Sequence, residues 1–167
     1  MLMNMMVLWN NYIVLIMRFN VVILMAISVL KKISEKDACS ILLKQEQELS
    51  VVNIDEIKES TRQENQYYCY VDFKMQDGTQ FGASYSFYLE DEFATPNSVL
   101  FSCGTSSKLY YLLKGFLDLN PLTDVGLTFQ KTDIDEILLN KKFVASAIVQ
   151  SVGGKTYPYI VCKKVIE

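Results

Sequence analysis

The order of the turns after Leu49 constrains the fold more than any other feature of this sequence. Two runs of alternating aromatic and polar residues flank Asp77-Gly78, an apolar run with helical spacing follows Ser106, and two more strand-like runs flank Gly153-Gly154. A weaker alternation over residues 49–57 adds a first strand. The order strand, strand, strand, helix, strand, strand is that of a five-stranded Greek-key barrel of the OB type. We therefore predict a mainly β domain with one principal helix.

The hairpin over residues 67–89 predicts its own register. A two-residue loop at Asp77-Gly78 would pair Phe73 with Gly82 and would mix the two faces of the sheet. A three-residue loop over residues 76–78, with its glycine in the left-handed conformation, pairs apolar residues with apolar residues. The predicted pairs are Phe73 with Phe81, Val71 with Ala83, Cys69 with Tyr85 and Tyr67 with Phe87.

In this register the outer face of the hairpin carries tyrosines beside a lysine. Tyr68, Tyr70 and Tyr88 are candidates for stacking on bases, each stack contributing on the order of 1–3 kcal/mol. Lys74 is a candidate phosphate contact. The tyrosines are equally explained as strand-forming residues that pack against the N-terminal segment or a partner subunit. Asp72 lies on the same face and would repel phosphate.

A predicted helix follows the hairpin and begins among hydroxyl groups. Its apolar residues at helical spacing are Leu109, Leu112, Leu113, Phe116 and Leu117. Thr105 or Ser106 is the predicted N-cap. Residues 103–108 also place backbone N–H groups and a lysine at the helix start, an arrangement that attracts anions. The second glycine of a phosphate-binding loop is missing from this segment, so simple capping is the favoured role.

The composition argues against several classes of function. The chain has no histidine, and its cysteines at 39, 69, 103 and 162 are far apart, so we predict neither a metal site nor a cofactor. The sequence offers no nucleophile–base pair, so we predict that the protein is not an enzyme. Its net charge of −3 argues against binding duplex DNA mainly through phosphate charge. Cysteines without a disulfide pattern fit a cytoplasmic protein.

Residues 1–30 form an apolar segment that ends at Lys31-Lys32, and three interpretations compete for it. A membrane helix over residues 7–30 would keep the domain in the cytoplasm, but it would place Arg18 near mid-bilayer at roughly 2.5–3.5 kcal/mol. A secretory signal would need a basic start and a small-residue cleavage site, which the segment lacks. We favour a spurious N-terminal extension, with Met25 as the true start, over an anchor.

The rest of the chain divides into a lead-in over residues 31–48 and the β domain over residues 49–167. Ser34 and Asp37 have the spacing of a capped helix start, although the lead-in is equally compatible with a polar irregular stretch. Near the end of the domain, Asp133 is predicted to open one further helical turn.

Two segments near the C-terminus resemble a known family. They are residues 133–145 (DIDEILLNKKFVA) and 154–161 (GKTYPYIV). Together they are similar to the C-terminal signature of phage- and plasmid-borne OB-fold proteins related to single-stranded-DNA-binding proteins. That signature is an acidic residue with Leu-Leu-Gly-Lys, a strand, Gly-Lys-Tyr and a second strand. Asn140 stands where those proteins usually have glycine.

The resemblance implies a non-enzymatic accessory protein of a mobile element or phage that binds single-stranded DNA. In this hypothesis the three tyrosines of the outer face stack on bases, and Lys74, Lys141 and Lys155 contact phosphates. The alternative is a protein-interaction or assembly module, with a protein partner or a second copy on the tyrosine face. Such a module would be tethered to the membrane only if residues 7–30 were a genuine anchor.

Overall fold

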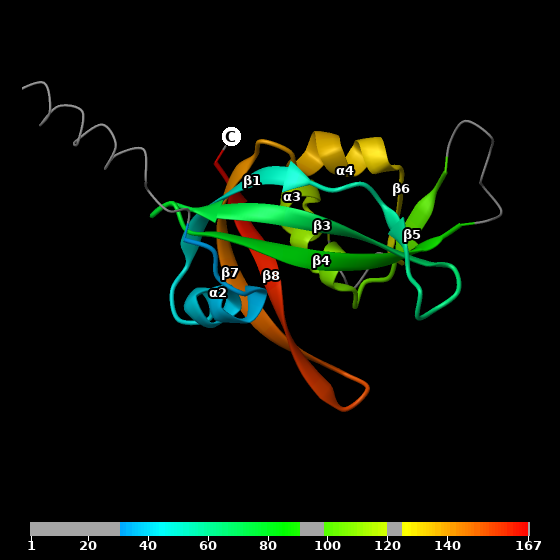
Figure 1. The fold of residues 1–167 in the computed structure, drawn as a ribbon, viewed down its shortest axis with the longest axis horizontal. Coiled ribbons are helices and arrows are strands. Elements are labelled where there is room, and N and C mark those ends of the chain that lie inside the picture. The colour runs from blue at the N-terminus through cyan, green and yellow to red at the C-terminus, as the bar shows by residue number, and fades with distance from the viewer. Residues whose placement is uncertain (1–30, 91–98, 120–124, 167) are drawn as a thin grey trace, which may run out of the picture. The chain divides into compact units, whose positions relative to one another are not determined.

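The computed structural model describes residues 31–90, 99–119 and 125–166 (Figure 1). The predictions of a membrane anchor over residues 7–30, or of a spurious extension ahead of a true start at Met25, therefore lie outside the described residues. In the described part of the chain, no helix is both long enough and apolar enough to cross a membrane.

Eight strands form one antiparallel sheet in the described residues. They are β1 (Gln47–Ile54), β2 (Lys58–Glu59), β3 (Gln66–Met75), β4 (Gln80–Leu89), β5 (Phe101–Cys103), β6 (Leu127–Phe129), β7 (Lys142–Val152) and β8 (Lys155–Val165). Their order is β6-β5-β4-β3-β1-β7-β8, and β2 pairs with β3. The predicted mainly β fold is confirmed. In the described residues the sheet has β6 and β8 as its end strands and is not closed, so the closed five-stranded barrel of the prediction is not confirmed.

The predicted register of the β3–β4 hairpin is confirmed. Phe73 pairs with Phe81, and the other three predicted pairs are also present. The Met75 N–H donates to the Thr79 carbonyl at 2.8 Å, which leaves residues 76–78 as the loop. Gly78 has φ +87°, a left-handed conformation that costs glycine little. The Asp77 carboxylate accepts from the Thr79 N–H at 2.9 Å and its hydroxyl at 3.0 Å, and these hydrogen bonds lower the pKa of Asp77.

Three helices occur in the described residues: α2 (Glu35–Leu42), α3 (Lys108–Leu117) and α4 (Lys131–Leu138). The lead-in is thus partly helical, and the Ser34 hydroxyl oxygen caps α2 by accepting from the Asp37 N–H at 3.1 Å. The predicted cap of α3 at Thr105 or Ser106 is wrong. Ser107 is the cap, accepting from the Tyr110 N–H at 3.1 Å, because residues 104–107 first close a turn of their own.

The segment before β7 consists of the capped helix α4 and a left-handed turn. The helix α4 starts at Lys131, two residues before the predicted Asp133, and Asp133 accepts from the Gln130 N–H at 2.7 Å in a capping box. Asn140, in the turn between α4 and β7, has φ +62°. Asparagine is one of the few residues that adopt this left-handed conformation at low cost. Asn140 therefore suits the turn into β7.

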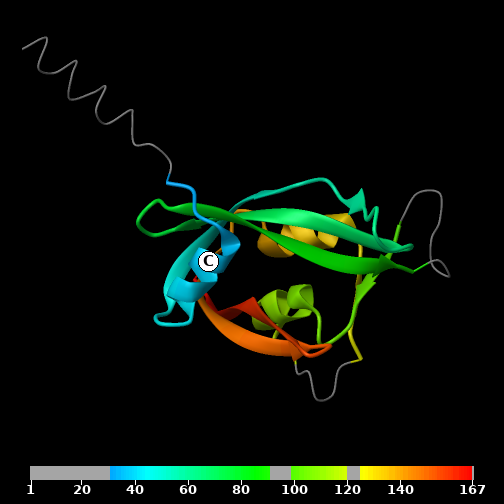
Figure 2. The same ribbon diagram turned by 60° about the horizontal axis from the view of Figure 1, so that its bottom comes forward.

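The opening of the sheet is occupied by helices. Figure 2 shows β3 and β4 on one side and β7 and β8 on the other, with α3 between them. The helix α2 packs against β4, β7 and β8. The core enclosed by these elements is apolar and aromatic. Its largest fully buried side chains are Tyr85, Tyr110, Phe73, Phe87, Phe143, Leu42, Leu49, Leu109, Leu112, Leu113, Ile134 and Leu138.

Two strand edges face the opening of the sheet and both are blocked: the part of β4 that does not pair with β5, and the outer edge of β8. On β4, Gln80 exchanges backbone hydrogen bonds with residues 31 and 33, and the Ser84 carbonyl accepts from Lys108 Nζ at 2.8 Å. On β8, Pro158 has no N–H to donate to a further strand. Gly115 of α3 lies so close to β8 that an added Cβ would be 2.7 Å from Cys162 Cβ. These features explain why β4 and β8 do not meet, and they protect both edges against strand addition.

Candidate functional site

A cleft of about 1320 Å³ lies along the opening of the sheet. Its walls come from α2, the end of β4, the turn before α3 and the tip of the β7–β8 hairpin. Large apolar and aromatic side chains stand exposed on these walls. They are Leu43 (48% exposed), Tyr88 (44%), Val149 (56%), Val152 (47%) and Tyr157 (44%). Exposed apolar surface gathered in one hollow is typical of a binding site.

Lys108, a lining residue of the cleft, links α2 to β4. Its Nζ forms an ion pair with Glu35 of α2 and donates to the Ser84 carbonyl of β4. The same atom lies 4.8 Å from the centre of the buried Tyr85 ring, a cation–π distance. Lys108 is therefore committed to the structure, and the segment before α3 acts as a cap and not as a free anion site. Lys36 is a second lysine on the cleft wall.

The structure brings the three predicted tyrosines to one face beside the cleft. Tyr68 and Tyr70 have ring centres 5.8 Å apart in an edge-to-face arrangement. Tyr68 pairs with Ser86, a lining residue of the cleft, and the Tyr88 hydroxyl accepts from Gln63 Nε2 at 3.4 Å. The face of the hairpin thus continues into the cleft at Ser86 and Tyr88. Tyr70 is 45% exposed, so its ring is open to a ligand.

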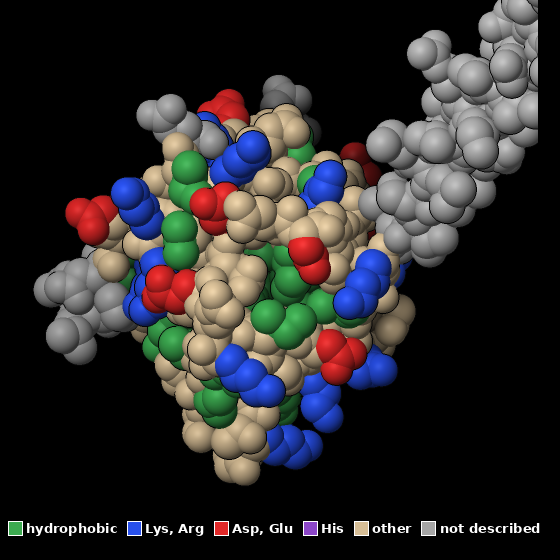
Figure 3. All heavy atoms as spheres, turned by 90° about the vertical axis from the view of Figure 1, so that its left-hand side faces the viewer, with side chains coloured by type: hydrophobic (Ala, Val, Ile, Leu, Met, Phe, Trp, Pro, Cys, Tyr) green, Lys and Arg blue, Asp and Glu red, His purple; other side chains and the backbone are tan. Residues whose placement is uncertain are grey.

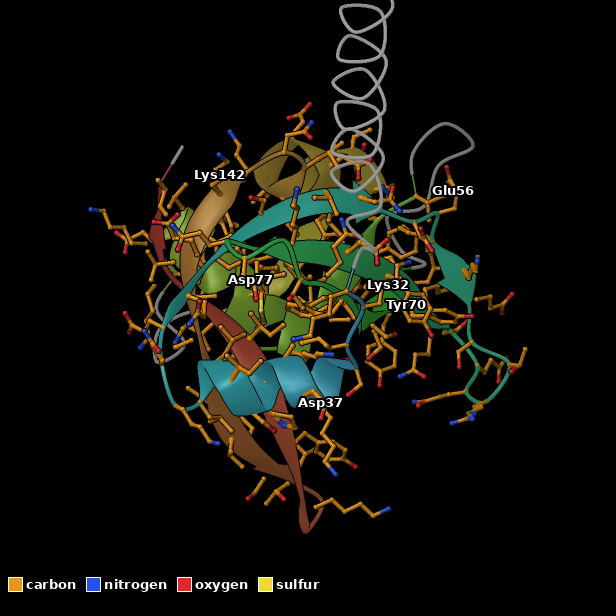
Figure 4. All side chains as sticks on the ribbon, turned by 60° about the vertical axis from the view of Figure 1, so that its left-hand side comes forward. Lys32, Asp37, Glu56, Tyr70, Asp77 and Lys142 are labelled. Carbon is orange, nitrogen blue, oxygen red and sulfur yellow. The ribbon has the colours of Figure 1, made fainter. Side chains whose placement is uncertain are left out.

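The three predicted lysines are not brought together. Lys74 lies on the outer face of β3 and Lys155 at the tip of the β7–β8 hairpin, whereas Lys141 precedes β7. The eleven residues of β7 separate Lys141 from Lys155, and a strand of that length spans about 36 Å. Lys142, not Lys141, occupies the position across β1 from Lys74. Figure 4 shows Lys142 well apart from Tyr70 on the surface.

Tyr157 of β8 lines the same cleft as Tyr88 of β4, and it is not among the predicted site residues. Next to it, Tyr159 packs on Tyr111 with ring centres 5.6 Å apart, and Gln150 Nε2 donates to the Tyr111 hydroxyl at 2.9 Å. Burial raises the pKa of Tyr159. The spacing of Tyr157 and Tyr159 across Pro158 was the available signal. This spacing predicts no more than an ordinary strand, because the point where the hairpin leaves the core is not visible in the sequence.

The cysteines are not arranged for chemistry. All four are free and buried, and burial raises the pKa of Cys39, Cys69 and Cys162 to about 11, so their thiols stay protonated. The described residues contain no group of three or more histidine, cysteine or acidic side chains placed to hold a metal ion. No family model matches the chain, and neither a curated protein nor a solved structure shows significant similarity to it.

Proposed function

We propose that the protein binds single-stranded nucleic acid, with bases stacked on tyrosines in the cleft and on the adjoining face of β3 and β4. The observation that carries this proposal is the placement of Tyr88 of β4 and Tyr157 of β8, each 44% exposed, in the lining of one cleft. Tyr68 and Tyr70 continue the aromatic surface outward along β3. A base has an aromatic face whatever its identity, so such a surface binds single strands without sequence readout.

The strand pairing supports an OB-type interpretation of this surface. The first long strand, β1, pairs with β3 and with β7, and each of these continues into a hairpin, β3–β4 and β7–β8. We interpret β1, β3, β4, β7 and β8 as the five strands of an OB barrel left open between the third and the fifth. OB folds bind oligonucleotides on the face of strands two and three and on two flanking loops. Here that face is β3–β4, and the loops are residues 55–65 and the β7–β8 turn.

The electrostatics of the cleft favour stacking over charge. Its charged lining residues are Glu35, Lys36 and Lys108, and the first and last of these neutralise each other. Figure 3 shows lysines and carboxylates interspersed at the end of the molecule that carries the β3–β4 turn. Affinity in the cleft should therefore depend weakly on salt, since few counterions are released per bound strand.

One observation favours the rival function, a protein-interaction module. Leu43, Val149 and Val152 add exposed aliphatic surface to the cleft, and such surface suits an apolar partner segment. The blocked edges of β4 and β8 argue against a partner that adds a strand. A protein ligand would have to dock through side chains.

The test is fluorescence anisotropy with a labelled oligothymidine over a salt series, with duplex DNA of equal length as the control. We expect binding to the single strand in preference to the duplex, with a shallow dependence of log affinity on log salt. Tyr88→Ala and Tyr157→Ala should each weaken binding by on the order of 1–3 kcal/mol, whereas Tyr88→Phe and Tyr157→Phe should keep most of the affinity, because the stacking ring remains.

Two outcomes would reject the proposal. One is the absence of binding at micromolar protein and low salt, and the other is equal affinity for duplex. Either result would favour the protein-interaction function, for which Val149→Ser and Val152→Ser are the informative variants. Neither serine substitution removes a buried core residue, since both valines are exposed.

A further inference from the structure

Two lysines flank a serine on the outer face of the sheet, away from the cleft. Ser50 of β1 pairs with Lys74 of β3 on one side and with Lys142 of β7 on the other. Directly paired residues in an antiparallel sheet project from the same face. The burial pattern agrees, because the next row, Leu49 with Met75 and Phe143, is buried.

The row encloses a hollow that fits a small anion. Two strand spacings place the Cα atoms of Lys74 and Lys142 about 10 Å apart, with only the short Ser50 side chain between them. A hollow of about 280 Å³ lies there, lined by both lysines and Ser50. Long lysine side chains on either side can bring both ammonium groups to one anion, with the serine hydroxyl as a third donor.

The two lysines have no competing partner in the described part of the chain, where the only ion pairs are those of Lys108 and Lys131. Lys164 adds a third positive charge, because it pairs with Val144, two residues along β7 from Lys142. Glu48 is the one carboxylate that lines the hollow. The lining of the hollow, two lysines against one glutamate, is net positive, and Lys164 lies outside the lining, across Val144 from Glu48.

We infer that this hollow is a phosphate-binding site that holds the backbone of the nucleic acid after it leaves the cleft. The inference rests on the proposed function and extends it. Tyr68 and Lys74 are six residues apart on the same face of β3, which corresponds to about 20 Å. A strand that stacks on Tyr68 and Tyr70 and continues along β3 reaches the hollow, whereas a short oligonucleotide held in the cleft does not.

The inference predicts a dependence on oligonucleotide length. We would compare the wild type with K74Q, K142Q and the double variant, using oligothymidines of about 5 and about 15 nucleotides, within the range of site sizes known for OB folds. Lys44→Gln is the matched control, because Lys44 is exposed and lines neither cavity. The double variant should bind the long strand roughly five- to tenfold more weakly, with a salt slope smaller by about 0.7 per lost phosphate contact. Its affinity for the short strand should stay unchanged.

The result separates the two proposals. If the wild type binds both strands and the double variant matches Lys44→Gln on the long one, the phosphate site is refuted and the cleft function stands. If no strand binds, inorganic phosphate tests the site alone through the ¹⁵N–¹H NMR shifts of Ser50 and its neighbours. Saturable shifts that are lost in the double variant would support the phosphate site, although the proposed binding of single strands would be rejected. Their absence in the wild type would overturn it.

Discussion

The β3–β4 and β7–β8 hairpins have nearly equal lengths but bury different parts of themselves. In β3–β4 alternate residues are buried from Cys69 to the turn and back to Phe87. In β7–β8 burial is confined to the base, and the tip from Val149 to Tyr157 is exposed apart from the half-buried Gln150. The first hairpin is held by its own core face along its length. The second is held at its base by α3, and its tip is left free to form a wall of the cleft.

The largest effect is expected from a substitution at the base of β7–β8, where α3 packs on β8. Gly115→Ala should lower the free energy of unfolding by about 3 kcal/mol or more, because the new methyl group would overlap the Cys162 carbonyl and Cβ and would push α3 from β8. Urea denaturation measures this loss. Gly104→Ala is the control, since nothing lies within 4 Å of its added Cβ and its stability should change little. Equal stability of the two variants would show that α3 does not fix β8.

Each hairpin also contains a buried cysteine. We expect the free energy of unfolding to fall at alkaline pH, when these two thiols ionise. Burial raises the pKa of Cys69 in β3 and of Cys162 in β8 from 9.0 to about 11. The folded state therefore holds these protons more tightly than the unfolded chain. This stabilisation is complete below pH 9.0 and is lost as the pH rises through about 11, by on the order of 2 kcal/mol per thiol.

Urea denaturation under reducing conditions at about pH 8 and about pH 10.5 tests this sign. Cys69→Ala should flatten the decline relative to the wild type, because the variant has lost one titrating group. Ser86→Ala, an exposed position on β4, should leave the decline unchanged. A variant at Cys69 with the full wild-type decline would contradict the assignment of the titration to this thiol.

A smaller effect is expected at the turn of β3–β4. Gly78→Val should cost about 1 kcal/mol or somewhat more, because a β-branched residue resists the φ of +87° at this position. No atom lies within 4 Å of an added Cβ, so the cost is conformational and not steric. Gly78→Asn should lose less in the same denaturation experiment, because asparagine tolerates the left-handed region. Equal losses for the two variants would argue against a conformational cause.

The fold was predictable from the sequence where it depends on local pairing, and not where it depends on contacts between distant residues. The β3–β4 register was predictable, since an error of one residue would have placed Gly82 opposite Phe73 and mixed the faces. The open sheet was not predictable, because it depends on contacts between distant residues, such as Lys108 with Ser84 and Gly115 with Cys162. The alternation of each strand is the same whether or not β4 and β8 meet.

The candidate site was predictable to a similar extent. Tyr68, Tyr70 and Tyr88 were found because a confirmed register places them on one face. The positions of Tyr157 in the cleft and of Lys142 opposite Lys74 were not predictable, because they depend on which strands are neighbours and on where the core ends. Pairing partners two strands apart, such as Lys74 and Lys142 across Ser50, leave no local pattern in the sequence.

The smallest effect is expected from a substitution of Asp72. It tests whether the outer face of β3–β4 takes part in binding. Asp72 lies between Tyr70 and Lys74 on that face, and Asn53 Nδ2 donates to its carboxylate at 3.4 Å. The negative charge repels phosphate along the proposed path. Asp72→Asn should therefore raise the affinity for the long oligothymidine about two- to threefold at low salt, and the gain should vanish at high salt.

Anisotropy with the long oligothymidine measures this gain, and Glu46→Gln, an exposed position between α2 and β1, is the matched loss of one negative charge. A gain at Asp72 beyond that of the control would show that the strand passes along β3. If the two variants behave alike while Tyr157→Ala still weakens binding, the strand does not cross β3–β4. The two variants would behave alike because a charge removed from a surface that the ligand never approaches acts only within about one Debye length. The cleft and the tip of β7–β8 would then be the whole interface.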